Sequence, residues 1–111
     1  MGDYLRPTEL GEALAALAAG RHVVLAGGTD FYPARVGKPL SEDVLDITAL
    51  AALKGITRES AGWRIGCLTT WTDLLRTPLP PLFRGLKEAA REVGGVQIQN
   101  GGTLCGNLCN A

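Results

Sequence analysis

Two glycine-rich segments constrain the fold of this chain more than any other feature. They read LAGGTDFYP at residues 25–33 and NGGTLCGNLCNA at residues 100–111. A strand-like apolar run, VVLA at 23–26, enters the first, and an alternating run, VQIQN at 96–100, precedes the second. Glycine adopts backbone angles closed to other residues and lets the main chain approach a ligand closely. Successive exposed amides then form a concavity suited to phosphate oxygens. We therefore expect two strand-to-loop anion sites and no helix in the second segment.

The first segment alone admits two interpretations. Thr29 offers a hydroxyl donor beside the glycines, which favours an anion site. Equally, the segment is an ordinary strand-to-helix turn in which Asp30 caps one or two helical turns over 31–36. The spacing matches neither the G-x-G-x-x-G nor the G-x-x-x-x-G-K-[ST] pattern, so an ordinary Rossmann or P-loop site is not supported.

The second segment repeats the chemistry of the first and adds side-chain amides. Asn100, Asn107 and Asn110 can each donate and accept hydrogen bonds. A glycine-rich turn between strands is the simpler interpretation. Two Gly-Gly-Thr loops that each follow a strand nevertheless suggest two walls of one anionic pocket, in which backbone amides hold a diphosphate without lysine or arginine.

Composition excludes several classes of partner. The net charge is zero, whereas a nucleic-acid-binding surface needs a basic patch. No apolar run approaches the length of a membrane span, and the N-terminus lacks the features of a signal peptide. Three cysteines are an odd and sparse set, which indicates a reduced, cytoplasmic setting. Cys105 and Cys109 lack a second pair at metal-ligand spacing, so we predict no metal site.

Periodicity predicts the remaining elements. Helices are expected over 8–19 with Thr8 as N-cap, over 71–76 with Thr70 as N-cap, and over 82–93. Strands are expected at 23–26, 44–47 and 96–100, with a hairpin formed by 56–60 and 63–68. A helical turn closed by glycine is expected at 49–55. This order predicts an α+β fold with a βαβ-like start.

Three motifs in order carry a family resemblance. LAGGTDFYP, IGCLTTWTDLL and QIQNGGTLCGNLCNA, preceded by YLRPTELGEALAAL, resemble the FAD-binding module of the molybdopterin dehydrogenases, the xanthine dehydrogenase and carbon monoxide dehydrogenase group. The resemblance implies the N-terminal part of a vanillyl-alcohol-oxidase-like (PCMH-type) FAD-binding fold. It further implies a small α/β subdomain at 1–56 and the beginning of a second α+β subdomain at 57–111. The family's module continues beyond the position of Ala111, so a truncated module is expected.

The resemblance also implies a set of cofactor contacts, largely through main-chain amides. In the first loop these are Ala26, Gly27, Gly28, Thr29 and Asp30, and in the second they are Asn100, Thr103, Gly106 and Asn107. The segment 66–70 approaches the cofactor in the family. Two positions depart from the family pattern. Cys105 stands where glycine is common, and Gln99 stands where arginine is common.

By the same resemblance, the chain is an oxidoreductase component that holds FAD and contributes no catalytic side chain. The flavin would pass electrons from iron–sulphur clusters to NAD+ or another acceptor. The implied partners are a molybdopterin-binding large subunit and a 2Fe-2S small subunit. Two alternatives stay open. One is a degenerate module without FAD that acts only as a structural or docking unit. The other is a relative of the cell-wall UDP-sugar reductases, against which the NGGTLCGN loop argues. An exposed edge of the strand expected at 96–100 would promote self-association.

Overall fold

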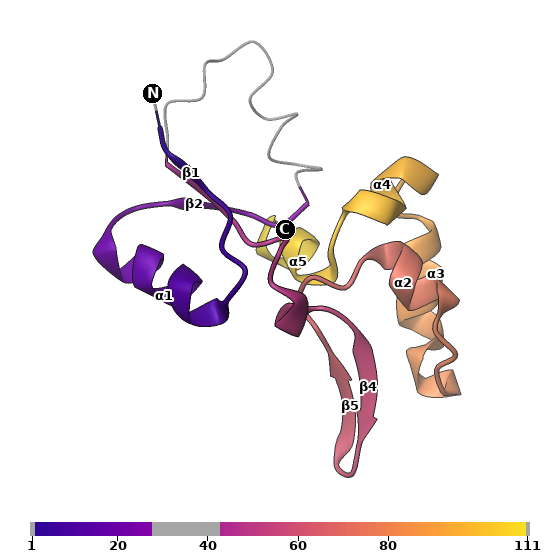
Figure 1. Ribbon diagram of the computed structural model, residues 1–111. Helices are drawn as coiled ribbons and strands as arrows, with labels where there is room; N and C mark the ends of the chain where they lie inside the picture. Colours follow the sequence, from indigo (N-terminus) through magenta and orange to yellow (C-terminus); the bar gives the residue numbers. More distant parts are fainter. Residues whose placement is uncertain (1, 28–42, 111) are drawn as a thin grey trace. The chain divides into compact units, whose positions relative to one another are not determined.

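The computed structural model describes residues 2–27 and 43–110, which fall into two compact units, Met1–Ala52 and Leu53–Ala111 (Figure 1). The short helix expected at 31–36 lies outside the described residues. None of the helices in the described ranges has the length and hydrophobicity that crossing a bilayer requires.

The first unit is built on a parallel sheet. Strand β3 (Val44–Asp46) is central, with β1 (Tyr4–Leu5) on one side and β2 (Val23–Leu25) on the other, and both pairings are parallel. Val44 and Leu45 are fully buried, as expected for the central strand of a parallel sheet. The strands expected at 23–26 and 44–47 and the βαβ-like start are thus confirmed.

Helix α1 (Leu10–Ala19) connects β1 to β2. Its N-cap is Glu9, and no side chain caps it, so the expected Thr8 cap is wrong. The helix begins two residues after Thr8, which leaves that hydroxyl outside the capping position. Ala13 is the buried residue of the helix, and the three leucines of its apolar stripe are each more than 40% exposed: Leu10, Leu14 and Leu17.

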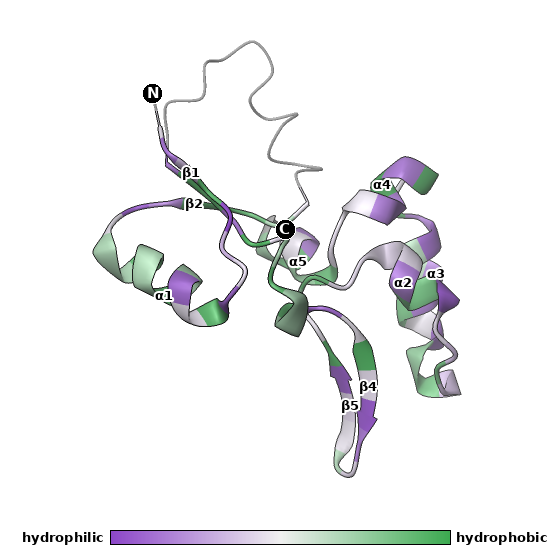
Figure 2. Ribbon diagram, in the orientation of Figure 1, coloured by the Kyte–Doolittle hydropathy of each residue, from purple (hydrophilic) through white to green (hydrophobic). Residues whose placement is uncertain are grey.

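The second unit begins with an antiparallel hairpin, as predicted. A 3-10 turn, η2 (Ala51–Leu53), leads to Gly55, whose φ of 102° is the left-handed closure expected there. Strands β4 (Ile56–Glu59) and β5 (Gly62–Ile65) pair in register from Ile56 opposite Ile65. Figure 2 shows apolar and polar residues along both strands, so the hairpin offers apolar side chains to a core at its base.

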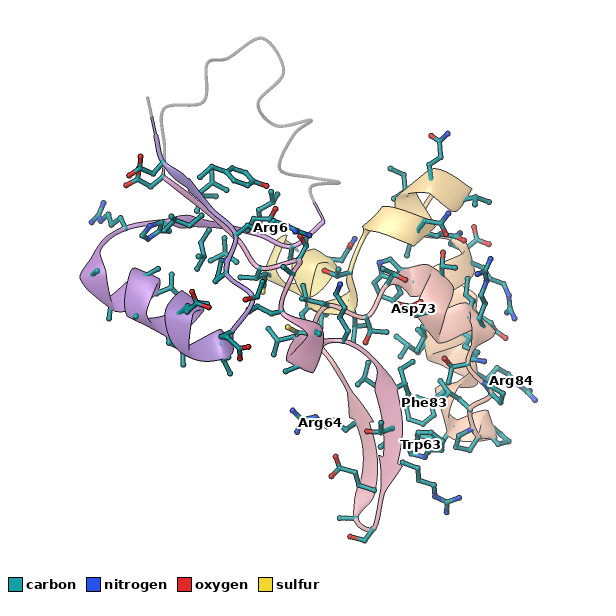
Figure 3. The ribbon with its side chains drawn as sticks, viewed as in Figure 1. Arg6, Trp63, Arg64, Asp73, Phe83 and Arg84 are labelled. Atoms are coloured by element: carbon teal, nitrogen blue, oxygen red, sulfur yellow. The ribbon has the colours of Figure 1, made fainter. Side chains whose placement is uncertain are left out.

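Two helices form that core with the hairpin. Helix α2 (Trp71–Arg76) starts at the predicted Thr70 N-cap and carries a complete capping box with Asp73. The helix expected over 82–93 is divided into a 3-10 turn, η3 (Pro81–Phe83), and helix α3 (Arg84–Arg91), because the Pro80-Pro81 pair opens the segment with a tighter turn. Trp71, Leu74 and Ala90 form the buried centre. Trp63 meets Phe83 edge to face, with ring centroids 6.1 Å apart (Figure 3).

The last segment contradicts the sequence-based expectation. Residues expected as a strand form helix α4 (Val96–Gly101), and the glycine-rich segment expected as a loop forms helix α5 (Leu104–Asn110). Glycine disfavours helix interiors by only about 1 kcal/mol, and tertiary hydrogen bonds outweigh that preference here. The strand edge that would have promoted self-association is therefore not present at 96–100.

Candidate functional site

In the second unit, the segment 66–70 meets the second glycine-rich segment. The amide of Leu104 donates to the carbonyl of Thr69 at 2.9 Å, and the amide of Trp71 donates to the carbonyl of Gly102 at 3.3 Å. Thr70 and Thr103 consequently face each other in an antiparallel bridge. We call this contact the Thr70–Thr103 junction. It joins two of the three motifs, although 33 positions separate its two threonines.

The segment 66–70 is itself fixed to the chain just before β4. The amide of Gly66 donates to the carbonyl of Gly55, and the amide of Leu68 donates to that of Leu53, both at 2.8 Å. A Cβ at position 66 would lie 2.3 Å from the carbonyl oxygen of Leu53, a distance that no side chain can occupy. Glycine at 66 is therefore required by space.

Helix α5 uses its first four amides inside the protein. Those of Leu104 and Cys105 donate to the carbonyls of Thr69 and Cys67, at 2.9 and 3.3 Å. The amide of Gly106 donates to Oγ1 of Thr103 at 3.1 Å, and that of Asn107 donates to the Thr103 carbonyl at the same distance. Thr103 is only 5% exposed and acts as the N-cap. A ligand at this helix would therefore meet side-chain donors rather than these amides.

Two asparagine side chains flank the junction, each with its oxygen engaged. Nε1 of Trp71 donates to Oδ1 of Asn107 at 3.3 Å. Oγ1 of Thr72 donates to Oδ1 of Asn100. The Nδ2 groups are the remaining donors of both amides. Local sequence patterns do not signal either contact, because the partners lie 36 and 28 positions apart.

The two departures from the family pattern take part in internal structure. Nε2 of Gln99 donates to the carbonyls of Arg91 and Gly94, at 3.1 and 3.0 Å, and so closes the end of α3. Cys105 lies beside Cys67, whose thiol pKa is raised by burial and then by the neighbouring Cys105. Among residues 2–27 and 43–110, no three His, Cys, Asp or Glu side chains gather in a way that could hold a metal ion.

In the first unit, Ala26 and Gly27 follow the carboxyl end of β2. Gly27 has a φ of 143°, an angle that other residues rarely adopt. The amide of Ile47 donates to the carbonyl of Leu25 at 3.0 Å, which holds the end of β2 against β3. The rest of the predicted first loop, Gly28, Thr29 and Asp30, lies outside the described residues. In open parallel sheets, ligands bind at this carboxyl end of the strands.

A charged network occupies the same end of the sheet. Asp46, 5% exposed, accepts from the amide and hydroxyl of Thr48 at 2.9 and 2.6 Å, and also from the hydroxyl of Tyr4. Nε of Arg6 lies 3.6 Å from the Asp46 carboxylate. Burial acts to raise the pKa of Asp46, but the hydrogen bonds from Thr48 and Tyr4 and the charge of Arg6 outweigh it, so the pKa is lowered. The carboxylate therefore stays ionised and ties the ends of β1 and β3 together.

Comparison with known proteins agrees with these features. The family described as "FAD binding domain in molybdopterin dehydrogenase" matches residues 1–111. The chain is 36% identical over 119 residues to caffeine dehydrogenase subunit beta of Pseudomonas sp. (strain CBB1), covering 98% of this chain and 38% of that one. It is 37% identical over 112 residues to a putative xanthine dehydrogenase FAD-binding subunit of Escherichia coli (strain K12), covering 97% and 38%.

A solved structure has the same fold. The carbon monoxide dehydrogenase of Hydrogenophaga pseudoflava that lacks the Mo-pyranopterin moiety superposes with a TM-score of 0.80 at 32% identity, over 96% of this chain and 39% of that one. The α+β FAD-binding fold is thus confirmed. The chain spans about two fifths of the length of the relatives it matches. With its whole length matched, the chain belongs to the family of FAD-binding domains of molybdopterin dehydrogenases, whose cofactor is FAD.

Proposed function

We propose that this chain binds FAD as part of the flavin subunit of a molybdenum-containing hydroxylase or dehydrogenase. The observation that carries the proposal is the family match over residues 1–111. The Thr70–Thr103 junction supports it, because two of the motifs behind the resemblance are physically joined there.

The residues of the second segment fit a diphosphate. Asn100 and Asn107 each keep an Nδ2 donor, and Thr103 keeps its hydroxyl hydrogen. Phosphate oxygens accept hydrogen bonds from neutral donors of this kind, and the segment 100–107 contains no carboxylate to repel them. Because the first four amides of α5 are engaged, the side chains supply this segment's contacts in our proposal.

The proposed site also includes the first glycine-rich loop, Ala26 to Asp30. In our proposal this loop contributes to FAD binding, with Gly27 bending the chain and Thr29 donating its hydroxyl. The subdomain limits of 1–56 and 57–111 belong to the same proposal.

The residues of this chain bind and orient the cofactor and need no acid, base or nucleophile. Bound FAD would supply the redox chemistry, which in our proposal is the transfer of electrons from iron–sulphur clusters to NAD+ or another acceptor. Relatives named as a subunit beta and a medium chain support an assembly with a molybdopterin-binding large subunit and a 2Fe-2S small subunit. We propose cytoplasmic localisation on the basis of the sparse cysteines.

Equilibrium titration with flavins tests the proposal. The purified chain is titrated with FAD, FMN and riboflavin, and binding is followed by flavin fluorescence and equilibrium dialysis. FAD alone of the three carries a diphosphate, so we expect it to bind at least about tenfold more tightly, a difference of about 1.4 kcal/mol. ADP, which carries the same diphosphate, should compete with FAD.

Two results would contradict the proposal. Equal affinities for FAD and riboflavin would place the contacts on the flavin ring and not on the diphosphate. A chain that stays folded by circular dichroism yet binds no FAD would favour a docking module without cofactor.

A further inference from the structure

We infer that Trp71 is a positioning residue that orients the side-chain amide of Asn107 so that it donates to the FAD diphosphate. This inference rests on the proposed function and deepens it. Trp71 belongs to the core of the second unit, and packing is the role that its burial alone suggests. Its polar edge has a second role, because the indole N–H selects which atom of the asparagine amide remains for a ligand.

The geometry of the contact carries the inference. Trp71 is 7% exposed, and its ring is held among core residues of α2 and α3. An indole has a single N–H donor and no acceptor, so its partner in an asparagine amide must be the oxygen. Nε1 lies 3.3 Å from Oδ1 of Asn107. The amide orientation of an asparagine follows from its hydrogen-bond partners, and here the indole fixes Oδ1 inward and leaves Nδ2 as the outward donor.

Gly102 packs beside this contact. A Cβ at position 102 would lie 3.4 Å from Oδ1 of Asn107, 3.4 Å from Cδ1 of Trp71 and 3.0 Å from the carbonyl oxygen of Ile98. Its φ of −67° is open to every residue. Space and not backbone angle favours glycine at 102: the Ile98 carbonyl oxygen is the tightest contact, and Trp71 and Asn107 lie at van der Waals distance.

The orientation matters because a diphosphate offers only acceptors. With Oδ1 outward, the amide would present a lone pair to the phosphate oxygens and repel them. Asn107 also lies in the first turn of α5, where the four amides are already engaged. The Nδ2 group of Asn107 is then the donor that α5 contributes, and Trp71 keeps it available.

A double-mutant cycle on FAD affinity tests the inference. Trp71→Phe keeps an aromatic ring in the core and removes the N–H. Because a neutral hydrogen bond contributes about 0.5–1.5 kcal/mol, we expect FAD and ADP to bind about three- to tenfold more weakly. Riboflavin binding should not change. In an Asn107→Ala background, the same Trp71→Phe change should have no further effect, because the amide that Trp71 orients is absent.

Trp63→Phe is the matched control. Trp63 is half-buried in the same unit and packs on Phe83, and we expect its replacement to leave FAD affinity within about twofold. Asn107→Asp provides a second readout. Its carboxylate still accepts from Trp71 but repels phosphate, so FAD affinity should fall at neutral pH and recover as acid protonates the new carboxyl.

The outcomes separate this inference from the proposed function. An equal loss from Trp71→Phe with and without Asn107, or an equal loss of riboflavin binding, would show that Trp71 acts through packing and would overturn the inference alone. A folded wild-type chain that binds no FAD would overturn both.

Discussion

Different interactions stabilise two regions of the molecule: the carboxyl end of the first unit's sheet and the Thr70–Thr103 junction of the second unit. At the sheet end, the ionised Asp46 collects hydrogen bonds from Thr48 and Tyr4 and lies near Arg6. At the junction, backbone hydrogen bonds join neutral segments. The first arrangement depends on charge and therefore on pH, whereas the second depends on the space that glycine leaves.

The glycines of the two regions differ in the same way. Gly27 is needed for its φ of 143°. Gly66 and Gly102 lack a positive φ; a Cβ has no room at 66 and is tight against the Ile98 carbonyl oxygen at 102. Glycine can therefore be needed for its backbone angle at one position and for close packing at another. Substitution by alanine tests each reason separately.

The largest effect should come from Gly66→Ala in the second unit. The added Cβ would lie 2.3 Å from the carbonyl oxygen of Leu53, so either Leu53 or the segment 66–70 must move. We expect a loss of about 3 kcal/mol in the free energy of unfolding, the upper end of the range for overpacking. Both tryptophans lie in the second unit, so tryptophan fluorescence in urea reports this unit.

Gly85→Ala is its matched control. Gly85 lies in α3 with no atom within 4 Å of the position of its Cβ. Alanine there should stabilise the unit by about 0.5–1 kcal/mol, because it restricts the unfolded chain. A Gly66→Ala protein as stable as the wild type would show that the junction is not held by space.

The next effect should come from Asp46→Asn in the first unit. The asparagine amide keeps one acceptor oxygen, but its NH₂ group faces donors that then lack an acceptor. We therefore expect the free energy of unfolding to fall by about 2 kcal/mol. Hydrogen exchange at the amides of Val44 and Leu45 measures the stability of this unit. Asp43→Asn is the control: Asp43 is exposed, and its side-chain oxygen Oδ1, which accepts the amide of Asp3 at 2.8 Å, has a counterpart in asparagine, so the change should cost less than about 0.5 kcal/mol.

The same carboxylate predicts sensitivity to acid. Its pKa in the folded state is lowered from 3.8, so the folded state binds its proton less readily than the unfolded state does. The stabilisation is therefore complete above the unfolded pKa and is lost as the pH falls through the lower, folded pKa. The difference in stability between wild type and Asp46→Asn should shrink in that acid range. A difference that stays constant there would mean that the charge of Asp46 does not hold the sheet end.

A smaller effect is expected at the helix cap beside the junction. Thr70→Ala removes the oxygen that accepts from the amide of Asp73 at 3.1 Å and leaves half of the capping box. The loss should be about 1 kcal/mol by tryptophan fluorescence in urea. Thr70→Ser keeps the hydroxyl and should restore most of the stability. Equal losses in the two variants would assign the effect to the methyl group of Thr70 and not to the cap.

Elements that depend on local sequence patterns could be predicted from the sequence. The strands β2 and β3, the hairpin and the Thr70 cap depend on local patterns, such as a short apolar run with β-branched residues or a threonine three residues before an aspartate, and they were predicted correctly. The family resemblance identified the cofactor through motif order.

The helices α4 and α5 could not be predicted in the same way. Their residues have weak helix propensity. Helix α5 is held by hydrogen bonds with Thr69, Cys67 and Trp71, more than 30 positions away, and α4 by the bond between Asn100 and Thr72, 28 positions away. The alternation of VQIQN fits a strand equally well, and only the tertiary partners decide between the two. The proposed positioning of Asn107 by Trp71 could not be predicted from the sequence either, because the two residues are 36 positions apart.

The smallest effect should appear at alkaline pH and in the second unit. Burial and the neighbouring Cys105 raise the pKa of the Cys67 thiol above its ordinary value of 9.0, so the folded state binds this proton more tightly than the unfolded state. The stabilisation is present below the unfolded pKa and is lost as the pH rises through the folded pKa. In the presence of reductant, the wild type should therefore lose more stability on alkalinisation than Cys67→Ala, by less than about 1 kcal/mol because the thiol is only partly buried. Cys109→Ala, at an exposed position, should follow the wild type. If Cys67→Ala and the wild type declined in parallel, the Cys67 thiol would not contribute to the alkaline loss of stability in the second unit.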